Sequence, residues 1–334
     1  MHAHMVPENF PAYIGNRLPA DWPSMASAHE CHRHVMISGK VYRTVSERCW
    51  SVPHRLEDML SMGLELQVVS PMPELFSYWM DAPAGQQLCR YLNDQTAAMV
   101  DASSGRLAGM GVVPLQDIDL AIRELEHAVR VLRMPAVEIG SNINGMAVGA
   151  PVFDPFFAAC EELGAAVFVH AVRPAGMDRL VGPAALQQVL AYPGDAGLAA
   201  ASVVTGGLMA RHPNLRIAFS HGGGTLASLL PRLQQGWHVF PALREAMPEP
   251  PVATVRRLFY DTLVFDDAML RHLLHTFGSD ALMVGTDYPF NFHERQPLQR
   301  LADAGFDDAT RHAITHGNAR RFLGLGPSIH KETS

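Results

Sequence analysis

Short apolar runs alternate with amphipathic stretches along most of this chain. The apolar runs predict seven strands, at 64–69, 107–113, 136–139, 166–169, 216–219, 258–260 and 282–284. Stretches with helical spacing follow them, at 85–100, 118–132, 153–163, 184–190, 198–209, 226–240, 267–277, 298–304 and 308–322. The predicted strands are apolar throughout, which is typical of parallel strands covered on both faces.

An eighth strand would have to come from residues 1–4, which make a short strand. Eight strands that each lead into helix predict an α/β fold, the (β/α)₈ TIM barrel, and a doubly wound open sheet is the alternative. We expect the natural chain to begin upstream of Met1, because a truncated central strand leaves barrel backbone groups unpaired.

The segment before residue 52 does not follow this alternation. It is rich in proline at first, and 33–43 then reads as a hairpin that turns at Ser38-Gly39. We interpret 11–51 as a small insertion after strand one. The prediction is therefore a single domain over 1–326, followed by a loose tail at 327–334.

The composition narrows the class of protein. The 334 residues are 48% hydrophobic, which excludes a disordered or collagen-like chain. With 26 Lys+Arg against 33 Asp+Glu, the net charge of −7 argues against a nucleic-acid partner. Small anionic substrates stay open, because a few local arginines can override a mild global charge.

Nothing in the sequence predicts a disulfide framework or a membrane segment. The four cysteines lack a CxxC pairing, which favours reduced thiols and a cytoplasmic location. The longest uncharged run, at 196–210, is short for a membrane span. The first residues lack the basic and apolar parts of a signal peptide.

The histidine count is unusual, at 17, and several of these histidines fall at predicted strand ends. His2 and His4 share one face of strand one, His170 and His221 end the fifth and sixth strands, and Asp287 follows the eighth. In a barrel these positions open on the C-terminal face, where catalytic groups collect. Imidazoles with a carboxylate suit Zn²⁺, Fe²⁺ or Mn²⁺.

The run His221-Gly-Gly-Gly224 also fits two other motifs. One is the oxyanion-hole motif of lipases, but no serine here has the flanking glycines of a nucleophile elbow. The other is a dinucleotide fingerprint, which is weak because it sits two-thirds along the chain and has no convincing acidic partner at the end of the next strand. We interpret the glycines as a tight backbone turn beside His221.

Several motifs together resemble the amidohydrolase superfamily. They are His2-Ala-His4, Val167-Phe-Val-His170, Phe219-Ser-His-Gly-Gly-Gly224, Gly285-Thr-Asp-Tyr-Pro-Phe290, Val113-Pro-Leu-Gln-Asp117 and Gly317-Asn-Ala319. Within the superfamily, the chain is most similar to the family of α-amino-β-carboxymuconate-ε-semialdehyde decarboxylases and their relatives. The resemblance covers nearly the whole chain.

The resemblance implies a role for each strand-end residue. His2, His4, His170 and Asp287 would hold one Zn²⁺, with Fe²⁺, Mn²⁺ or Co²⁺ as alternatives. His221 would be the acid/base residue acting on a metal-bound water, which Asp287 would help to polarise. One ion is favoured because the end of strand four, at 139–142, lacks the lysine that bridges two metals in binuclear relatives.

The resemblance also implies arginines that bind a substrate carboxylate. Arg43 and Arg232 match the family's positions, and the second of these reaches the neighbouring subunit's pocket, which implies a homodimer. The planar fork of arginine suits a carboxylate. Where the family carries Pro-Trp-Asp after the fifth-strand histidine, this chain has Ala171-Val172-Arg173. Arg173 either adds a carboxylate contact or faces solvent.

The function that follows is a metal-dependent, non-oxidative decarboxylase of an unsaturated or aromatic carboxylic acid. A hydrolase or hydratase acting on an amide, a lactone or a double bond is an alternative, as is a catalytically silent metal-binding barrel. The same fold and metal ligands serve different substrates, so these alternatives stay open at the level of sequence. Neither a nucleic acid nor a membrane is expected as a partner.

Overall fold

Eight strands form one sheet in the computed structural model, which describes residues 1–325. Every pairing of neighbouring strands within it is parallel. The order along the sheet is β1 (His4–Met5), β5 (Gln67–Pro71), β6 (Leu107–Val112), β7 (Ala136–Gly140), β10 (Ala166–His170), β11 (Ile217–Phe219), β12 (Phe259–Asp261) and β13 (Leu282–Met283). The tail predicted at 327–334 lies outside the described residues.

The two edges of this sheet meet beside β1. The backbone N–H of His4 donates to the carbonyl of Tyr288 at 2.7 Å, and that of Asp287 donates to the carbonyl of His2 at 2.9 Å. A parallel bridge pairs Ala3 with Tyr288. These contacts close the sheet, so the predicted (β/α)₈ barrel is confirmed and the open doubly wound sheet is wrong.

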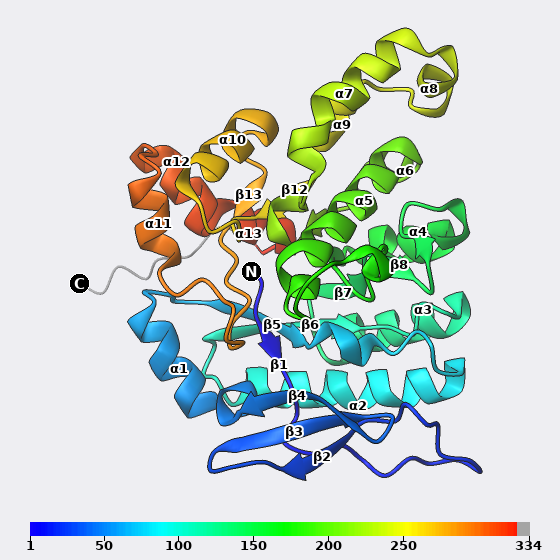
Figure 1. Ribbon diagram of the computed structural model, residues 1–334, viewed down its shortest axis with the longest axis vertical. Helices are drawn as coiled ribbons and strands as arrows, with labels where there is room; N and C mark the ends of the chain where they lie inside the picture. The colour runs from blue at the N-terminus through cyan, green and yellow to red at the C-terminus, as the bar shows by residue number, and fades with distance from the viewer. Residues whose placement is uncertain (326–334) are drawn as a thin grey trace.

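Helices surround the barrel, as Figure 1 shows. They are α1 (Val52–Ser61), α2 (Ala82–Asp101), α3 (Ile118–Glu126), α4 (Asp154–Leu163), α5 (Tyr192–Thr205), α6 (Leu208–Arg211), α7 (Leu226–Val239), α8 (Pro241–Ala246), α9 (Pro251–Val255), α10 (Asp267–Phe277), α11 (Pro297–Asp303), α12 (Asp308–His312) and α13 (Asn318–Leu323). They cover strands such as β7 and β10, whose residues are all buried. None of these helices is long and apolar enough to cross a membrane.

Both bounds of the helix predicted at 198–209 are wrong, because α5 ends at Thr205 and α6 is a separate helix at Leu208–Arg211. The sequence pattern separates 184–190 from a helix at 198–209, whereas α5 begins at Tyr192 directly after a π-helical turn at Gln187–Ala191. Pro193 lies in the first turn of α5, where a missing N–H costs nothing. The start of α5 consequently lies beside the barrel mouth, where Tyr192 lines a cavity.

The segment at 11–51 contains a separate antiparallel sheet of β2 (Ser24–Ser27), β3 (His32–Ile37) and β4 (Lys40–Ser46). The predicted hairpin is confirmed, because β3 and β4 are joined at Ser38-Gly39, which have φ angles of 51° and 72°. Positive φ at both positions is what a tight two-residue hairpin turn requires. A short hairpin of β8 (Asn142–Ile143) and β9 (Met146–Ala147) was not predicted.

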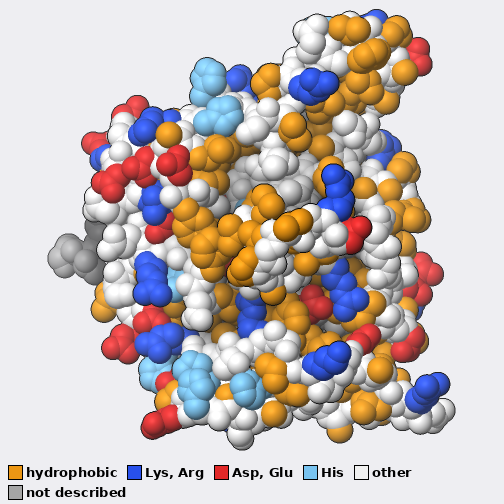
Figure 2. All heavy atoms as spheres, viewed as in Figure 1, with side chains coloured by type: hydrophobic (Ala, Val, Ile, Leu, Met, Phe, Trp, Pro, Cys, Tyr) orange, Lys and Arg blue, Asp and Glu red, His pale blue; other side chains and the backbone are white. Residues whose placement is uncertain are grey.

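An arm of α7 and α8 extends away from the barrel (Figure 1). Figure 2 shows hydrophobic side chains along this arm. Three hydrophobic residues of α7 and of its junction with α8 are largely exposed, namely Leu229 at 51%, Val239 at 55% and Phe240 at 58%. Exposed apolar side chains gathered in one region are typical of a protein–protein contact.

Candidate metal centre

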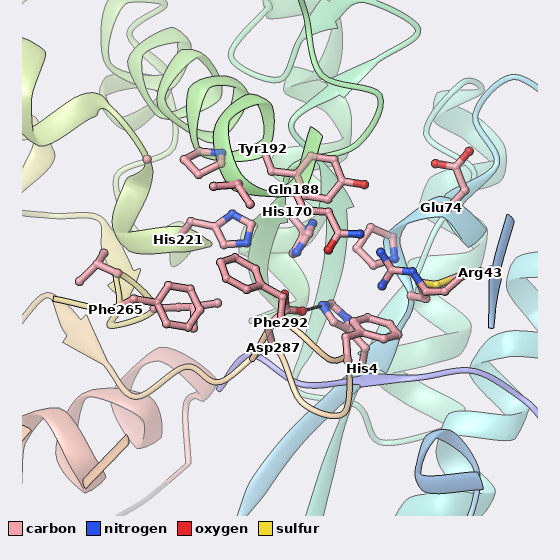
Figure 3. A pocket seen from close by; sticks show the side chains of 18 of the residues that line it. His4, Arg43, Glu74, His170, Gln188, Tyr192, His221, Phe265, Asp287 and Phe292 are labelled. Atoms are coloured by element: carbon pink, nitrogen blue, oxygen red, sulfur yellow. Dashed lines mark ion pairs between the residues drawn. The ribbon is translucent and has the colours of Figure 1, made fainter. Parts of the chain in front are cut away.

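Three histidines and one aspartate meet at the carboxyl end of the barrel. His2 and His4 come from the start of the chain and β1, His170 is the last residue of β10, and Asp287 follows β13. One nitrogen or oxygen atom from each of the four lies within 4.8 Å of the others. Figure 3 shows His4, His170 and Asp287 directed toward one another.

The distances within this group are short for side chains that lack a shared partner. The Nε2 atoms of His2 and His4 lie 3.0 Å apart, and Oδ1 of Asp287 lies 3.1 Å from Nε2 of His4. The Nε2 atom of His170 is buried and has no hydrogen-bond partner among the described residues. Each histidine is therefore placed to offer a nitrogen to one common point.

The partners of the opposite ring nitrogens explain this arrangement. Nδ1 of His170 donates to the carbonyl of Ala171 at 2.8 Å, and Nδ1 of His2 donates to Asp261 at 2.6 Å. A neutral imidazole that donates its proton from Nδ1 keeps a free lone pair on Nε2. Together with Nε2 of His4 and the Asp287 carboxylate, these two lone pairs fit a single divalent cation in a nitrogen- and oxygen-rich site.

Asp287 is held as a carboxylate. Burial alone would raise its pKa, but the hydrogen bond to His4 and the neighbouring imidazoles lower the pKa of Asp287 to about 2. Its backbone lies in the left-handed region, at a φ of 60°. Such a conformation is uncommon outside glycine and is tolerated for aspartate. The loop after β13 thereby turns its carboxylate toward the histidines.

His221 lies beside the four residues but outside the set that shares one point. Its ring centroid is 5.0 Å from that of His170 and 5.4 Å from that of His2. Burial, together with the nearby His2, lowers the pKa of His221 to about 4. The imidazole is therefore neutral at neutral pH, which is the state of a proton acceptor.

The glycines after His221 have a steric role that agrees with the interpretation from sequence. Gly224 has a φ of 58°, and a Cβ atom there would lie 1.9 Å from the carbonyl oxygen of Pro193. Gly222 has a φ of 63°. Only a residue without a side chain lets the backbone pass so close to α5, and this close passage positions His221 at the cavity.

Two buried acidic residues that the sequence reasoning did not single out support the histidines. Asp261 accepts hydrogen bonds from Nδ1 of His2 and from the backbone N–H of Gly222, at 2.6 and 2.8 Å. Glu138 on β7 lies 4.0 Å from Nδ1 of His4, and burial raises its pKa to about 8. Asp261 directly follows the strand predicted at 258–260, so the signal that identified His170 and His221 was present.

A cavity of about 290 Å³ opens above this group. Its lining includes His4, His170, His221 and Asp287 together with a polar set of Tyr42, Arg43, Glu74, Gln188 and Tyr192 and an apolar set that includes Leu263, Val264, Phe265, Met269, Leu273 and Phe292. In Figure 3, Phe265 lies on the opposite side of the cavity from Arg43 and Glu74. A ligand would thus meet one polar and one apolar wall.

Comparison with known proteins identifies the family. The family model described as amidohydrolase matches residues 1–325. The chain belongs to the amidohydrolase family. This amidohydrolase is 33% identical over 330 residues to the 2-amino-3-carboxymuconate-6-semialdehyde decarboxylase of Dictyostelium discoideum, covering 98% of this chain and 92% of that protein.

Two solved structures share the fold of this amidohydrolase. The 5-carboxyvanillate decarboxylase of Sphingomonas paucimobilis is 28% identical, with a TM-score of 0.74 and coverage of 82% of this chain and 83% of that one. The dihydroxybenzoic acid decarboxylase of Polaromonas sp. JS666, solved with bound manganese, is 22% identical, with a TM-score of 0.73 and coverage of 82% and 86%. Because the Polaromonas structure is only 22% identical, the similarity to it shows the fold alone.

The three arginines expected to bind substrate lie in different places in the amidohydrolase. Arg43 on β4 lines the cavity, with its guanidinium 4.3 Å from the centre of the Phe290 ring. Arg173 is not among the residues that line this cavity; it pairs with Glu74 at 3.3 Å, and its side chain is 48% exposed. Arg232 lies exposed on α7 and is not among the residues that line the cavity of its own chain.

Proposed function

We propose that this amidohydrolase is a metal-dependent, non-oxidative decarboxylase of an unsaturated or aromatic carboxylic acid. The observation that carries the proposal is the convergence of His2, His4, His170 and Asp287 beneath a cavity that also holds His221 and Arg43. The similarity to several proteins named as decarboxylases supports it.

The four converging residues would hold one divalent cation, for which we propose Zn²⁺, with Fe²⁺, Mn²⁺ and Co²⁺ as alternatives. Three imidazoles and a carboxylate suit Zn²⁺, although the same donors also accept the other ions. Bound there, the cation would supply Lewis-acid polarisation of a substrate oxygen or water.

The protein's own residues would do the rest. Arg43 would bind a substrate carboxylate through two charge-assisted hydrogen bonds and fix its orientation. When the bond between carbon and the carboxyl group breaks, CO₂ leaves and the bonding electron pair stays on the carbon. His221, neutral at rest, would first take a proton from water or from the substrate and then return that proton to this carbon.

The test is a screen of unsaturated and aromatic carboxylates with the metal-loaded protein, followed by detection of CO₂. A decarboxylase releases one CO₂ per substrate without net uptake of water. Products that have gained water would instead establish the hydrolase or hydratase alternative. Absence of turnover across both substrate classes, with metal bound, would establish the silent barrel.

We also propose that the protein is a homodimer in which Arg232 serves the neighbouring cavity. The exposed position of Arg232 and the exposed Leu229, Val239 and Phe240 on the arm at α7 and α8 support this. The four cysteines are unpaired, which suits our proposal of a cytoplasmic location.

Mixed dimers test the contribution of Arg232. Co-refolding of Arg232→Ala and His221→Ala chains should restore about one quarter of the wild-type activity, because half of the dimers are mixed and each has one intact site. If Arg232 acts within its own chain, no site regains both groups and the mixture stays as inactive as its parts. A monomer in solution would also reject the proposal.

A further inference from the structure

Glu74 is the only carboxylate besides Asp287 among the described residues that line the cavity. It follows β5 in a short helical turn at Pro73–Phe76, and its side chain is 10% exposed. The roles assigned to the metal ligands, His221 and Arg43 leave it without a function. A buried carboxylate in a cavity needs partners, because an unpaired one is costly.

Arg173 provides one of these partners. Its Nη2 and Nε atoms lie 3.3 and 3.4 Å from Oε1 of Glu74, and its guanidinium stacks on Trp79, with the carbon centre 3.1 Å from the middle of the ring. The Arg173 loop is itself anchored, because the backbone N–H of Ala175 donates to Asp195 at 3.0 Å. Arg173 thus holds Glu74 from outside the cavity.

The other oxygen of Glu74 is available to a ligand. Within residues 1–325, Oε2 makes no hydrogen bond, since both contacts from Arg173 end on Oε1. Arg43 lines the same side of the cavity, as Figure 3 shows, and its guanidinium makes no hydrogen bond or ion pair with another described residue. The polar wall therefore presents a free cation beside a free acceptor.

We propose that Glu74 determines substrate specificity by accepting a hydrogen bond from an amino or hydroxyl substituent of the carboxylic acid that Arg43 binds. This inference rests on the proposed function, in that the cavity takes a carboxylate. A buried acceptor selects strongly for a ligand that carries the matching donor, since a ligand without one leaves the acceptor desolvated and unpaired. The same negative charge disfavours a second carboxylate at that position.

Arg173 acts in this proposal as a positioning residue. Its contact with Glu74 fixes the rotamer of the carboxylate, while its stacking on Trp79 fixes the guanidinium. Loss of Arg173 would free Glu74 to turn away from the substrate. We expect Arg173→Gln to raise KM for donor-bearing substrates and to leave kcat nearly unchanged.

The test compares kcat/KM for a matched set of acids that differ at one position, which carries an amino or hydroxyl group, a hydrogen or a second carboxylate. The wild type should prefer the donor-bearing acid to the hydrogen analogue by about tenfold or more. In Glu74→Gln this ratio should fall to about threefold or less, and the diacid should improve. Glu57→Gln, which removes a carboxylate from the exposed face of α1, should behave as the wild type.

Thermal unfolding and metal content are measured for each variant, so that kcat/KM is compared only between proteins that are folded and carry bound metal. A ratio that is unchanged in Glu74→Gln, or a wild type that prefers the hydrogen analogue or the diacid, overturns the inference. Measuring Kd of the same acids by calorimetry distinguishes failure of the role of Glu74 from failure of the proposed decarboxylase function. A preference for donors in Kd without CO₂ release would reject only the decarboxylase, whereas CO₂ release without any such preference would reject only the role of Glu74.

Discussion

Asp261 accepts a hydrogen bond of 2.6 Å from Nδ1 of His2, a contact between the seventh strand of the barrel and the residues just before the first. The same carboxylate accepts the backbone N–H of Gly222, next to His221. One buried aspartate therefore orients an imidazole that we propose as a metal ligand and the turn that carries the proposed acid/base residue. Partners of this kind fix the ring and increase its basicity as a ligand.

Asp261→Asn tests this relationship. The substitution keeps the shape but removes the charge that favours the Nδ1–H tautomer of His2, so metal affinity should fall by about 10- to 100-fold. Competition with a chelator of known affinity measures the change. Asp101→Asn, at the exposed end of α2, is the matched control and should bind metal as the wild type does. Equal affinity in both variants would remove Asp261 from the metal site.

His170→Ala should remove most of the bound metal. Its Nε2 atom is buried without a partner in the described structure and is one of the four converging donors. Elemental analysis after dialysis measures the metal per chain, and the exposed His275→Ala on α10 provides the control. A fully loaded His170→Ala protein would contradict the proposed ligand set.

His221→Ala, in contrast to His170→Ala, should keep its metal and lose its activity. Because His221 lies outside the converging set, the variant should keep its metal, while turnover should fall by about 100-fold or more with the loss of the proton-transfer group. Metal content and kcat measured on the same preparation separate the two effects. Loss of metal would instead make His221 a ligand and reject its acid/base role.

The pH dependence follows from the burial of His221. Burial and the nearby His2 lower its pKa from 6.5 to about 4, so the imidazole stays neutral and able to accept a proton as the pH falls through 6.5. The acid limb of kcat/KM should therefore lie well below pH 6.5, and a bound cation would shift it in the same direction. A limb centred near 6.5 in fully loaded enzyme would show that His221 is not the group that titrates.

Arg43→Gln should raise KM for carboxylate substrates by about 10- to 100-fold, since a charge-assisted hydrogen bond contributes more than a neutral one. The KM of Arg43→Lys should lie between those of the wild type and Arg43→Gln, because lysine keeps the charge and loses the planar fork. Arg17→Gln, exposed in the same 11–51 segment, is the control. An unchanged KM in Arg43→Gln would exclude a substrate contact.

The sequence by itself determined the barrel and the place of the proposed metal centre. Apolar strands followed by amphipathic helices fold as parallel units, and the carboxyl ends of parallel strands meet at one face. Residues at strand ends, such as His170, are therefore brought to that face whatever the loops do, whereas Asp287 lies in the loop after β13 and depends on its turn. The two-residue period likewise places His2 and His4 on one face.

Only the tertiary structure decided which of these groups share one point and what surrounds them. Asp261 and Glu74 acquire roles through partners far along the chain, His2 and Arg173, and no local periodicity encodes such contacts. Arg173 illustrates the limit, because its sequence position beside His170 suited either a substrate contact or solvent. Its direction depends on the packing of Trp79 and Glu74, which exist as neighbours only in the folded chain.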